Sequence, residues 1–233
     1  MIRLQHVSKV FGAGPSRVAA LSGISFHIAK GEFVVLTGAS GAGKTTLLRM
    51  LYRAETPSEG EIEVAGFDVT ELRRAEIPRL RRSIGIVFQD SKLLAGRSVF
   101  ENVAFVLRVL GVPRRDITPR AFAALKAVGL SARAQAFPHQ LSQGEAQRAS
   151  LARAIVKSPG LLLADEPTGN LDERATRGVF QLLREINAGG TVVVMATHDL
   201  DLVRQTNYRN IELREGAIAY DSAVDDSRAT GTR

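Results

Sequence analysis

A glycine-rich segment of this chain has the residue types and spacing of a phosphate-binding loop. It directly follows the apolar run 33–36 and precedes a helical pattern. Its members are Gly38, Ala39, Ser40, Gly41, Ala42, Gly43, Lys44, Thr45 and Thr46. The three glycines permit positive φ angles, so that successive backbone N–H groups can converge on phosphate oxygens. The partial positive charge of a helix that starts here would attract the same phosphates.

Two side chains of this loop can take part in chemistry directly. Lys44 can reach the β- and γ-phosphates of ATP, and the Thr45 hydroxyl can ligate Mg²⁺. A glycine-rich turn with a surface lysine is the alternative. The position of the loop between an apolar run and a helical pattern favours the phosphate site. The sequence therefore predicts ATP and Mg²⁺ as cofactors.

A pair of carboxylates follows a second apolar run, 161–164. Asp165 is expected on the metal side, acting through water, and Glu166 is expected as the general base that activates the attacking water. Two solvated acids at a strand end are the alternative. The phosphate loop elsewhere in the chain favours the catalytic interpretation, because hydrolysis needs both elements.

Two further residues stand at the ends of apolar runs. His198 follows the run 192–197 and can hydrogen-bond the γ-phosphate and the attacking water. Gln89 ends the run 84–88 and can contact both Mg²⁺ and water. Together with Lys44 and Glu166 they complete the predicted catalytic set, while Thr45, Gln89 and Asp165 are the predicted metal ligands.

The elements that must position these residues follow an α/β pattern, because short apolar runs alternate with longer helical patterns. The runs 33–36, 161–164 and 192–196 are apolar on both faces, which suits strands buried in a parallel sheet. Alternating apolar residues at 24–28 and 62–64 predict half-exposed antiparallel strands. Residues 91–140 have helical periodicity and no strand candidate, and we interpret them as a helical subdomain inserted into the core.

Composition narrows the class of protein further. The hydrophobic fraction of 45% is typical of a folded globular chain, and 31 Lys and Arg against 24 Asp and Glu give a formal charge of +7. The chain has no cysteine, which excludes a disulfide framework, a thiolate metal site and a cysteine nucleophile. Residues 1–6 lack the apolar core of a signal peptide, and charged residues interrupt the apolar stretch 99–112. We therefore expect a cytosolic chain.

The segment 141–148, with the sequence LSQGEAQR, resembles the signature motif of ABC-type ATPases. It follows the predicted helical subdomain and precedes Asp165, which is the order of motifs in that family. Residues 170–172 resemble the family's D-loop, and His198 resembles its switch histidine. On these motifs the chain is identified as a member of the ABC-type ATPases over residues 1–220.

The resemblance implies an ABC-type P-loop ATPase with a mixed sheet core, N-terminal antiparallel strands and an inserted helical subdomain. The ATP-binding domain would cover residues 1–220, with its core at 1–90 and 141–220 and its helical subdomain at 91–140. Residues 221–233 are polar and are expected to form a flexible tail.

The resemblance also implies further nucleotide contacts. Phe11 stands where the family usually has an adenine-stacking tyrosine, with Val18 packing nearby, although a core phenylalanine remains an alternative. In the family, the signature residues Ser142, Gln143 and Gly144 cap the γ-phosphate held by the opposite subunit. The chain is therefore expected to form a homodimer through ATP. Gln143 departs from the family's usual glycine, so a nucleotide switch with negligible hydrolysis remains open.

Three stretches, 1–9, 80–90 and 195–199, resemble the cell-division members of the family. This likeness implies an integral membrane partner whose cytosolic helix docks between core and helical subdomain near Gln89. It also implies control of septal peptidoglycan hydrolases, with the ATPase associated peripherally with the cytoplasmic side of the inner membrane at the division site. The ATPase subunit of a lipoprotein-release or macrolide-efflux transporter is the alternative.

A cluster of arginines falls outside these motifs, at Arg73, Arg74, Arg79, Arg81 and Arg82. We interpret the cluster as a solvated face. The alternative is that these arginines face anionic lipid head groups beside the membrane partner. No nucleic-acid partner is expected.

Overall fold

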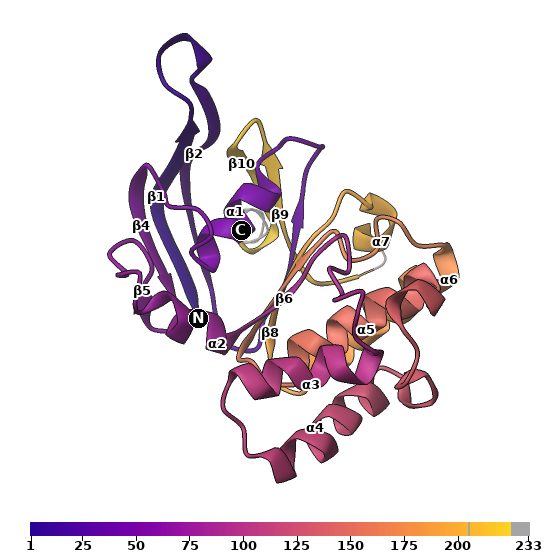
Figure 1. Cartoon of the computed structure of the whole chain (residues 1–233). Helices are drawn as coiled ribbons and strands as arrows, with labels where there is room; N and C mark the ends of the chain where they lie inside the picture. Colours follow the sequence, from indigo (N-terminus) through magenta and orange to yellow (C-terminus); the bar gives the residue numbers. More distant parts are fainter. Residues whose placement is uncertain (205, 225–233) are drawn as a thin grey trace.

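The computed structural model describes residues 1–204 and 206–224, apart from the side chain of Pro15. Two β-sheets form the centre of the fold (Figure 1). The smaller sheet has the strand order β2–β1–β4–β5, and the larger has the order β10–β9–β3–β8–β7–β6. The strands are β1 Ile2–Phe11, β2 Val18–Ile28, β3 Phe33–Thr37, β4 Glu59–Val64, β5 Phe67–Asp68, β6 Ile84–Val87, β7 Leu161–Asp165, β8 Val192–Ala196, β9 Arg209–Arg214 and β10 Ala217–Asp221.

The larger sheet confirms the predicted mixed core. Strands β6, β7, β8, β3 and β9 pair in parallel, and β10 adds an antiparallel edge to β9. Every residue of β3 and β8 is buried, as the apolar runs on both faces predict. Because parallel strands end at the same edge, the loops after β3, β7 and β8 come together there.

The smaller sheet confirms the predicted N-terminal antiparallel strands, because β1 pairs antiparallel with both β2 and β4. Strand β1 itself was not predicted from the sequence. Its alternation of buried residues begins at Ile2 and Leu4 and is then interrupted at His6, which has a φ of 50°. The register with β2 shifts between Leu4 and Val7, and this bulge interrupts the alternation of buried and exposed residues that would indicate a strand.

Helices cover the larger sheet and form the inserted subdomain. They are α1 Lys44–Leu51, α2 Ile77–Ser83, α3 Val99–Val109, α4 Arg114–Ala127, α5 Gln143–Ile155, α6 Glu173–Ala188 and α7 Leu200–Arg204, with short 3₁₀ turns at Gly14–Ser16, Ser131–Arg133 and Pro138–Gln140. Helices α3, α4 and α5 contact one another, and α5 also packs on β6. In Figure 1 α3 and α4 lie at the bottom, far from the β1–β2 hairpin at the top. The predicted helical subdomain is confirmed.

Two apolar clusters hold these layers together. One lies between the two sheets and includes Ile28, Leu47 and Ile62. The other lies between the larger sheet and the helical subdomain and includes Val103, Leu125 and Leu151. The ATP-site loops therefore stand on a sheet that is packed on both of its faces, which suits a site that needs fixed geometry.

The C-terminal boundary differs from the predicted one. Asp221, expected to begin the tail, is the last residue of β10 and is buried. Its carboxylate accepts hydrogen bonds from the Arg209 guanidinium at 2.9 and 2.7 Å, which holds β10 against β9. Residues 225–233 of the predicted tail lie outside the described residues. Among the helices of the described part, none is long and apolar enough to cross a membrane.

Candidate ATP site

The glycine-rich loop connects β3 to α1, as the sequence predicts. Gly38, Gly41 and Gly43 all have positive φ angles. At Gly43 a side chain would also collide with its surroundings, because an added Cβ would lie 2.6 Å from Leu21 Cδ2 and 2.7 Å from the Ala20 carbonyl oxygen. Gly43 is the N-cap of α1, so the loop turns tightly enough to direct the first N–H groups of α1 outward.

A cleft of about 570 Å³ opens over this loop. It is lined by Ala20, Ala39, Ser40, Gly41, Gly43, Lys44, Thr45, Thr46, Gln89, Glu166 and His198. Of the predicted loop residues, only Gly38 and Ala42 are not part of this lining. Ala20 was missed by sequence reasoning, because a small apolar residue on β2 carries no chemical signal. The structure thus brings the ends of β3, β6, β7 and β8 to one cleft.

Lys44 is held in the cleft by backbone carbonyls and a carboxylate. Its ammonium donates to the Gly38 and Ala39 carbonyl oxygens at 2.6 and 3.1 Å, and lies 3.5 Å from Glu166 Oε1. The side chain is only 6% exposed. A buried ammonium in such a position is available for an anion that enters the loop.

Glu166 occupies a strained position directly after β7. Its φ is 48°, which is uncommon for a residue with a side chain, and its N–H donates to the Ala196 carbonyl oxygen at 3.0 Å. Oε2 lies 2.6 Å from His198 Nδ1. The sequence predicts both residues for the site, but it does not predict this contact, which depends on β7 and β8 being neighbours.

Asp165 is bonded to the loop from the sheet side. The Thr45 hydroxyl donates to Asp165 Oδ1 at 3.0 Å. Burial raises the pKa of the Asp165 carboxyl, and the hydrogen bond from Thr45 opposes that effect. A hydroxyl oxygen and a carboxylate oxygen are therefore side by side at the edge of the cleft.

These two oxygens fit Mg²⁺, the metal that the sequence predicts. The described residues contain no group of three or more His, Cys, Asp or Glu side chains that could hold a metal by themselves. Mg²⁺ does not need one, because it usually takes one or two protein oxygens and completes its shell with water and substrate phosphates. The Thr45 and Asp165 oxygens are a donor set of that kind.

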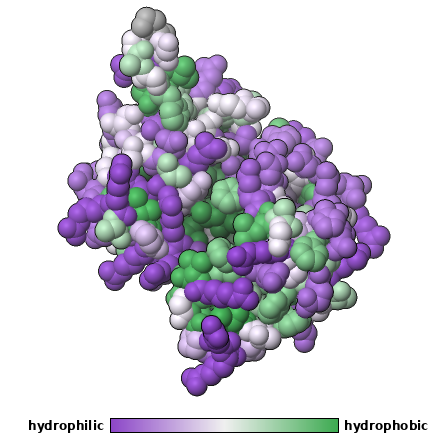
Figure 2. Space-filling view, in the orientation of Figure 1, coloured by the Kyte–Doolittle hydropathy of each residue, from purple (hydrophilic) through white to green (hydrophobic). Residues whose placement is uncertain are grey.

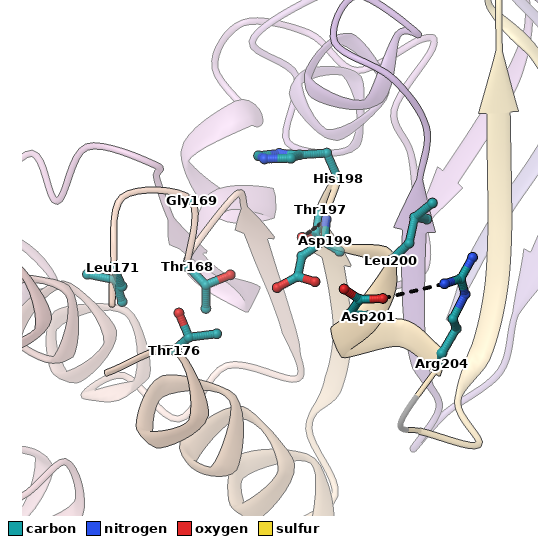
Figure 3. A pocket seen from close by; sticks show the side chains of 10 residues that line it. All are labelled: Thr168, Gly169, Leu171, Thr176, Thr197, His198, Asp199, Leu200, Asp201 and Arg204. Carbon is teal, nitrogen blue, oxygen red and sulfur yellow. Dashed lines mark hydrogen bonds and ion pairs between the residues drawn. The ribbon is translucent and has the colours of Figure 1, made fainter. Parts of the chain in front are cut away.

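Gln89 follows β6 and lines the same cleft as the loop. A Cβ placed on Gly169 would lie 3.7 Å from both Gln89 Nε2 and Glu166 Oε2, so the amide and the carboxylate approach the same point. A second hollow of about 560 Å³ adjoins the cleft and shares His198 with it. Figure 3 shows the loop with Thr168 and Leu171 on one side of this hollow and Asp199 and α7 on the other.

Phe11 and Val18 lie outside the cleft lining. They face each other across the β1–β2 pairing and are 38% and 62% exposed. The Lys9 ammonium sits 4.7 Å above the Phe11 ring. Val18 and Ala20 are two residues apart on β2 and so point to the same side of the sheet. Adenine stacking at Phe11 stays a prediction.

The predicted signature motif forms the start of α5. Ser142 is the N-cap, its Oγ accepts from the Glu145 N–H at 3.2 Å, and Glu145 Oε2 accepts from the Ser142 N–H at 2.9 Å. The bond from Ser142 holds the pKa of Glu145 below its usual value. Glu145 at this position is thus explained by helix capping. Gln143 is exposed and Gly144 is buried.

Within one chain the signature residues lie apart from the phosphate loop. Ser142, Gln143 and Gly144 line a separate hollow of about 480 Å³, together with residues of the start of α6. This hollow and the Lys44 cleft have no lining residue in common among the described residues. The N-terminus of α5 and Lys44 therefore line different hollows of the chain.

Comparisons with known proteins agree with this geometry. Residues 21–169 match the protein family described as ABC transporter. The cell division ATP-binding protein FtsE of Escherichia coli (strain K12) is 49% identical over 218 residues, which cover 94% of this chain and 97% of that protein. FtsE of Bacillus subtilis (strain 168) is 47% identical over 223 residues, 96% of each chain.

Among solved structures, this chain is similar to the ATP-binding cassette MJ0796, determined as a dimer in a post-hydrolysis state with ADP and Pi. The TM-score is 0.85 at 34% identity, and the match covers 95% of this chain and 97% of that one. The predicted resemblance to ABC-type ATPases and to their cell-division members is confirmed.

Proposed function

This chain belongs to the ABC transporter family and is an ATPase, and we propose that it couples ATP binding and hydrolysis to cell division through a membrane partner. One observation carries the chemistry: the Glu166 carboxylate lies between the Lys44 ammonium, at 3.5 Å, and the His198 imidazole, at 2.6 Å, in the phosphate-loop cleft. The 49% identity to the cell division ATP-binding protein FtsE of Escherichia coli supports a role in cell division.

In the proposed reaction the phosphates of ATP take the place of the carbonyl oxygens that hold Lys44. The ammonium and the N–H groups at the start of α1 then bind the β- and γ-phosphates. Glu166 accepts a proton from the attacking water, while His198 orients the Glu166 carboxylate through Nδ1. Gln89 positions that water from its place in the cleft lining.

Thr45 and Asp165 are the proposed ligands of Mg²⁺. When bound, the ion neutralises charge on the β- and γ-phosphate oxygens. The raised pKa of Asp165 reflects the cost of keeping this carboxylate charged in a partly buried place, and a cation would offset that cost.

The active form is proposed to be a head-to-tail homodimer. The signature end of α5 and the Lys44 cleft are separate in one chain, so the γ-phosphate bound at Lys44 would be capped by Ser142, Gln143 and Gly144 of a second copy. Dimeric cassette structures of MJ0796, with 34–35% identity to this chain, support this arrangement.

The proposed membrane partner resembles FtsX and would contact the helical subdomain. Figure 2 shows apolar side chains gathered over α3 on the face in view. On α3 the side chains of Phe105 and Val109 are 36% and 65% exposed. Exposed apolar patches commonly mark protein interaction sites. Through this partner the ATPase would associate with the cytoplasmic side of the inner membrane and control septal peptidoglycan hydrolases.

Two measurements test the proposal. Purified wild-type protein should hydrolyse ATP with Mg²⁺, and Lys44→Ala should lower turnover by roughly 10²–10³-fold, as loss of a charge-stabilising donor does. In cells that depend on a plasmid copy of the gene, the wild-type chain should restore division and Lys44→Ala should not.

A membrane pull-down should then recover an integral membrane protein of the division machinery. Recovery of a lipoprotein-release or efflux permease, with division unaffected, would refute the cell-division role. Undiminished turnover in Lys44→Ala would place the active site elsewhere.

A further inference from the structure

The loop that carries Gln89 is held by the helix that begins at the signature motif. Gln147 Nε2, on α5, donates to the Phe88 carbonyl oxygen at 3.0 Å. The Arg153 guanidinium, two turns further along α5, donates to the carbonyl oxygens of Ser91 at 2.7 Å and Lys92 at 2.6 Å. Three hydrogen bonds from one helix thus bracket Gln89 on both sides.

These bonds make α5 and the Gln89 loop move together. Gln147 is only 3% exposed, and Arg153 is half-buried. Among the ion pairs of the described residues, none includes Arg153, so its charge is satisfied by the two loop carbonyls. Separating loop and helix would leave a partly buried cation without these acceptors, which is far more costly than moving both as a unit.

The remainder of the loop is fixed to the same subdomain. Asn102 of α3 is fully buried; it accepts from the Leu94 N–H at 2.7 Å and donates to the carbonyl oxygens of Leu94, Arg97 and Ser98. Strand β6, directly before the loop, belongs to the larger sheet. Gln89 therefore lies at the junction where the helical subdomain meets the sheet, with its amide in the Lys44 cleft.

We propose that Gln147 and Arg153 are positioning residues that transmit nucleotide engagement from one ATP site of the dimer to the other. The first turn of α5 engages the ATP held by the partner, and the same helix positions Gln89 in the chain's own cleft. Docking of α5 on the partner's nucleotide thus moves Gln89 before hydrolysis at the second site. This inference rests on the proposed shared-site dimer.

The test separates the two sites by mixing two variants. The reporter chain carries Lys44→Ala, which prevents ATP from binding in its own cleft, and Asp90→Cys with an environment-sensitive fluorophore. The natural chain has no cysteine, so the label is unique. An excess of unlabelled Glu166→Gln chain supplies the ATP that the reporter's α5 can engage. Fluorescence anisotropy measures association, and the emission shift measures movement beside Gln89.

With Mg²⁺-ATP we expect association and an emission shift. Adding Arg153→Met or Gln147→Met to the reporter should reduce the shift at least threefold while association persists, and Arg153→Lys should restore part of it. Arg120→Met is the matched control, since Arg120 donates at 3.4 Å to the Val156 carbonyl oxygen beyond α5, outside the loop. Its shift should equal that of the parent reporter, and the thermal melts of all variants should confirm folding.

Each contrary result refutes a different step. If Glu166→Gln chains do not dimerise with ATP, the shared-site function fails. If they dimerise but the reporter does not join them, a single occupied site does not engage the facing α5, and the inference fails. If the reporter joins and both methionine variants keep the full shift, Gln147 and Arg153 do not transmit the movement.

Discussion

Replacing Glu166 by glutamine tests the proposed general base most directly. Glutamine keeps the shape of the side chain and its contact with His198, but it cannot accept a proton from water. General-base catalysis contributes about 10²–10⁴-fold, or about 2.7–5.4 kcal/mol of the barrier. We expect the upper part of this range, because the neighbouring Asp165 carboxylate is already bonded to the Thr45 hydroxyl and cannot take over the role.

The same substitution should strengthen ATP binding. Glu166 Oε1 lies 3.5 Å from the Lys44 ammonium and competes with phosphate for it. Its negative charge also repels the triphosphate. Removing both effects should tighten ATP binding by up to about tenfold, which corresponds to ~1.4 kcal/mol. Bound ATP should then persist and hold two chains together.

Three measurements on one preparation check this prediction: steady-state phosphate release, titration with a fluorescent ATP analogue, and sizing chromatography with Mg²⁺-ATP. Glu76→Gln is the matched control, since its exposed pair with Arg73 lies outside the cleft lining and should leave all three unchanged. Turnover within tenfold of wild type would mean that another group is the base. ATP binding without dimer would contradict the shared site.

Three further predictions follow from other parts of the molecule. Gln143→Gly should raise turnover of the isolated protein several-fold with monomer ATP affinity unchanged, because an exposed amide whose rotamers must be ordered on closure costs up to ~1.5–2 kcal/mol; unchanged or lower turnover would show that Gln143 assists closure. Asp165→Asn should raise the melting temperature of the nucleotide-free protein at pH 7. Burial raises the pKa of the Asp165 carboxyl from 3.8, so the charged carboxylate lowers the stability of the fold at pH 7, and asparagine removes that cost. The difference should shrink as the pH falls and Asp165 becomes protonated; a constant difference from pH 7 to 3 would contradict it. Asn102→Leu should lower the free energy of unfolding by about 1–3 kcal/mol, measured by urea denaturation, because it leaves loop N–H and C=O groups without partners; an unchanged urea midpoint would argue against that network.

Much of the sheet could be predicted from the sequence because its strands are buried on both faces. Strands β3, β7 and β8 appear as uninterrupted apolar runs, and the chain at or just after the end of each has residues whose chemistry is easy to interpret. Strand β1 could not be predicted in the same way, because the bulge at His6 breaks its alternation. A local pattern does not show where a strand bulges.

The candidate site was predictable residue by residue, but not contact by contact. Lys44 and Glu166 were expected from the motifs that contain them. Glu166 and His198 are 32 positions apart in the chain. The bond between them forms because the strands that precede them, β7 and β8, are neighbours in the sheet. The bonds from Gln147 and Arg153 reach backbone carbonyls 59 to 62 positions away. Every residue has a backbone carbonyl, so residue types do not indicate which carbonyls accept these bonds.

The separation of the signature hollow from the Lys44 cleft has a consequence for genetics. A shared site takes its phosphate loop from one gene product and its cap from another. A chain disabled at Lys44 and a chain disabled at Gly144 are each inactive as homodimers, yet a mixed dimer of the two contains one site in which both halves are intact. Two recessive alleles of this gene, expressed in one cell, should therefore restore ATP-driven dimerisation, whereas two alleles altered in the same half should not.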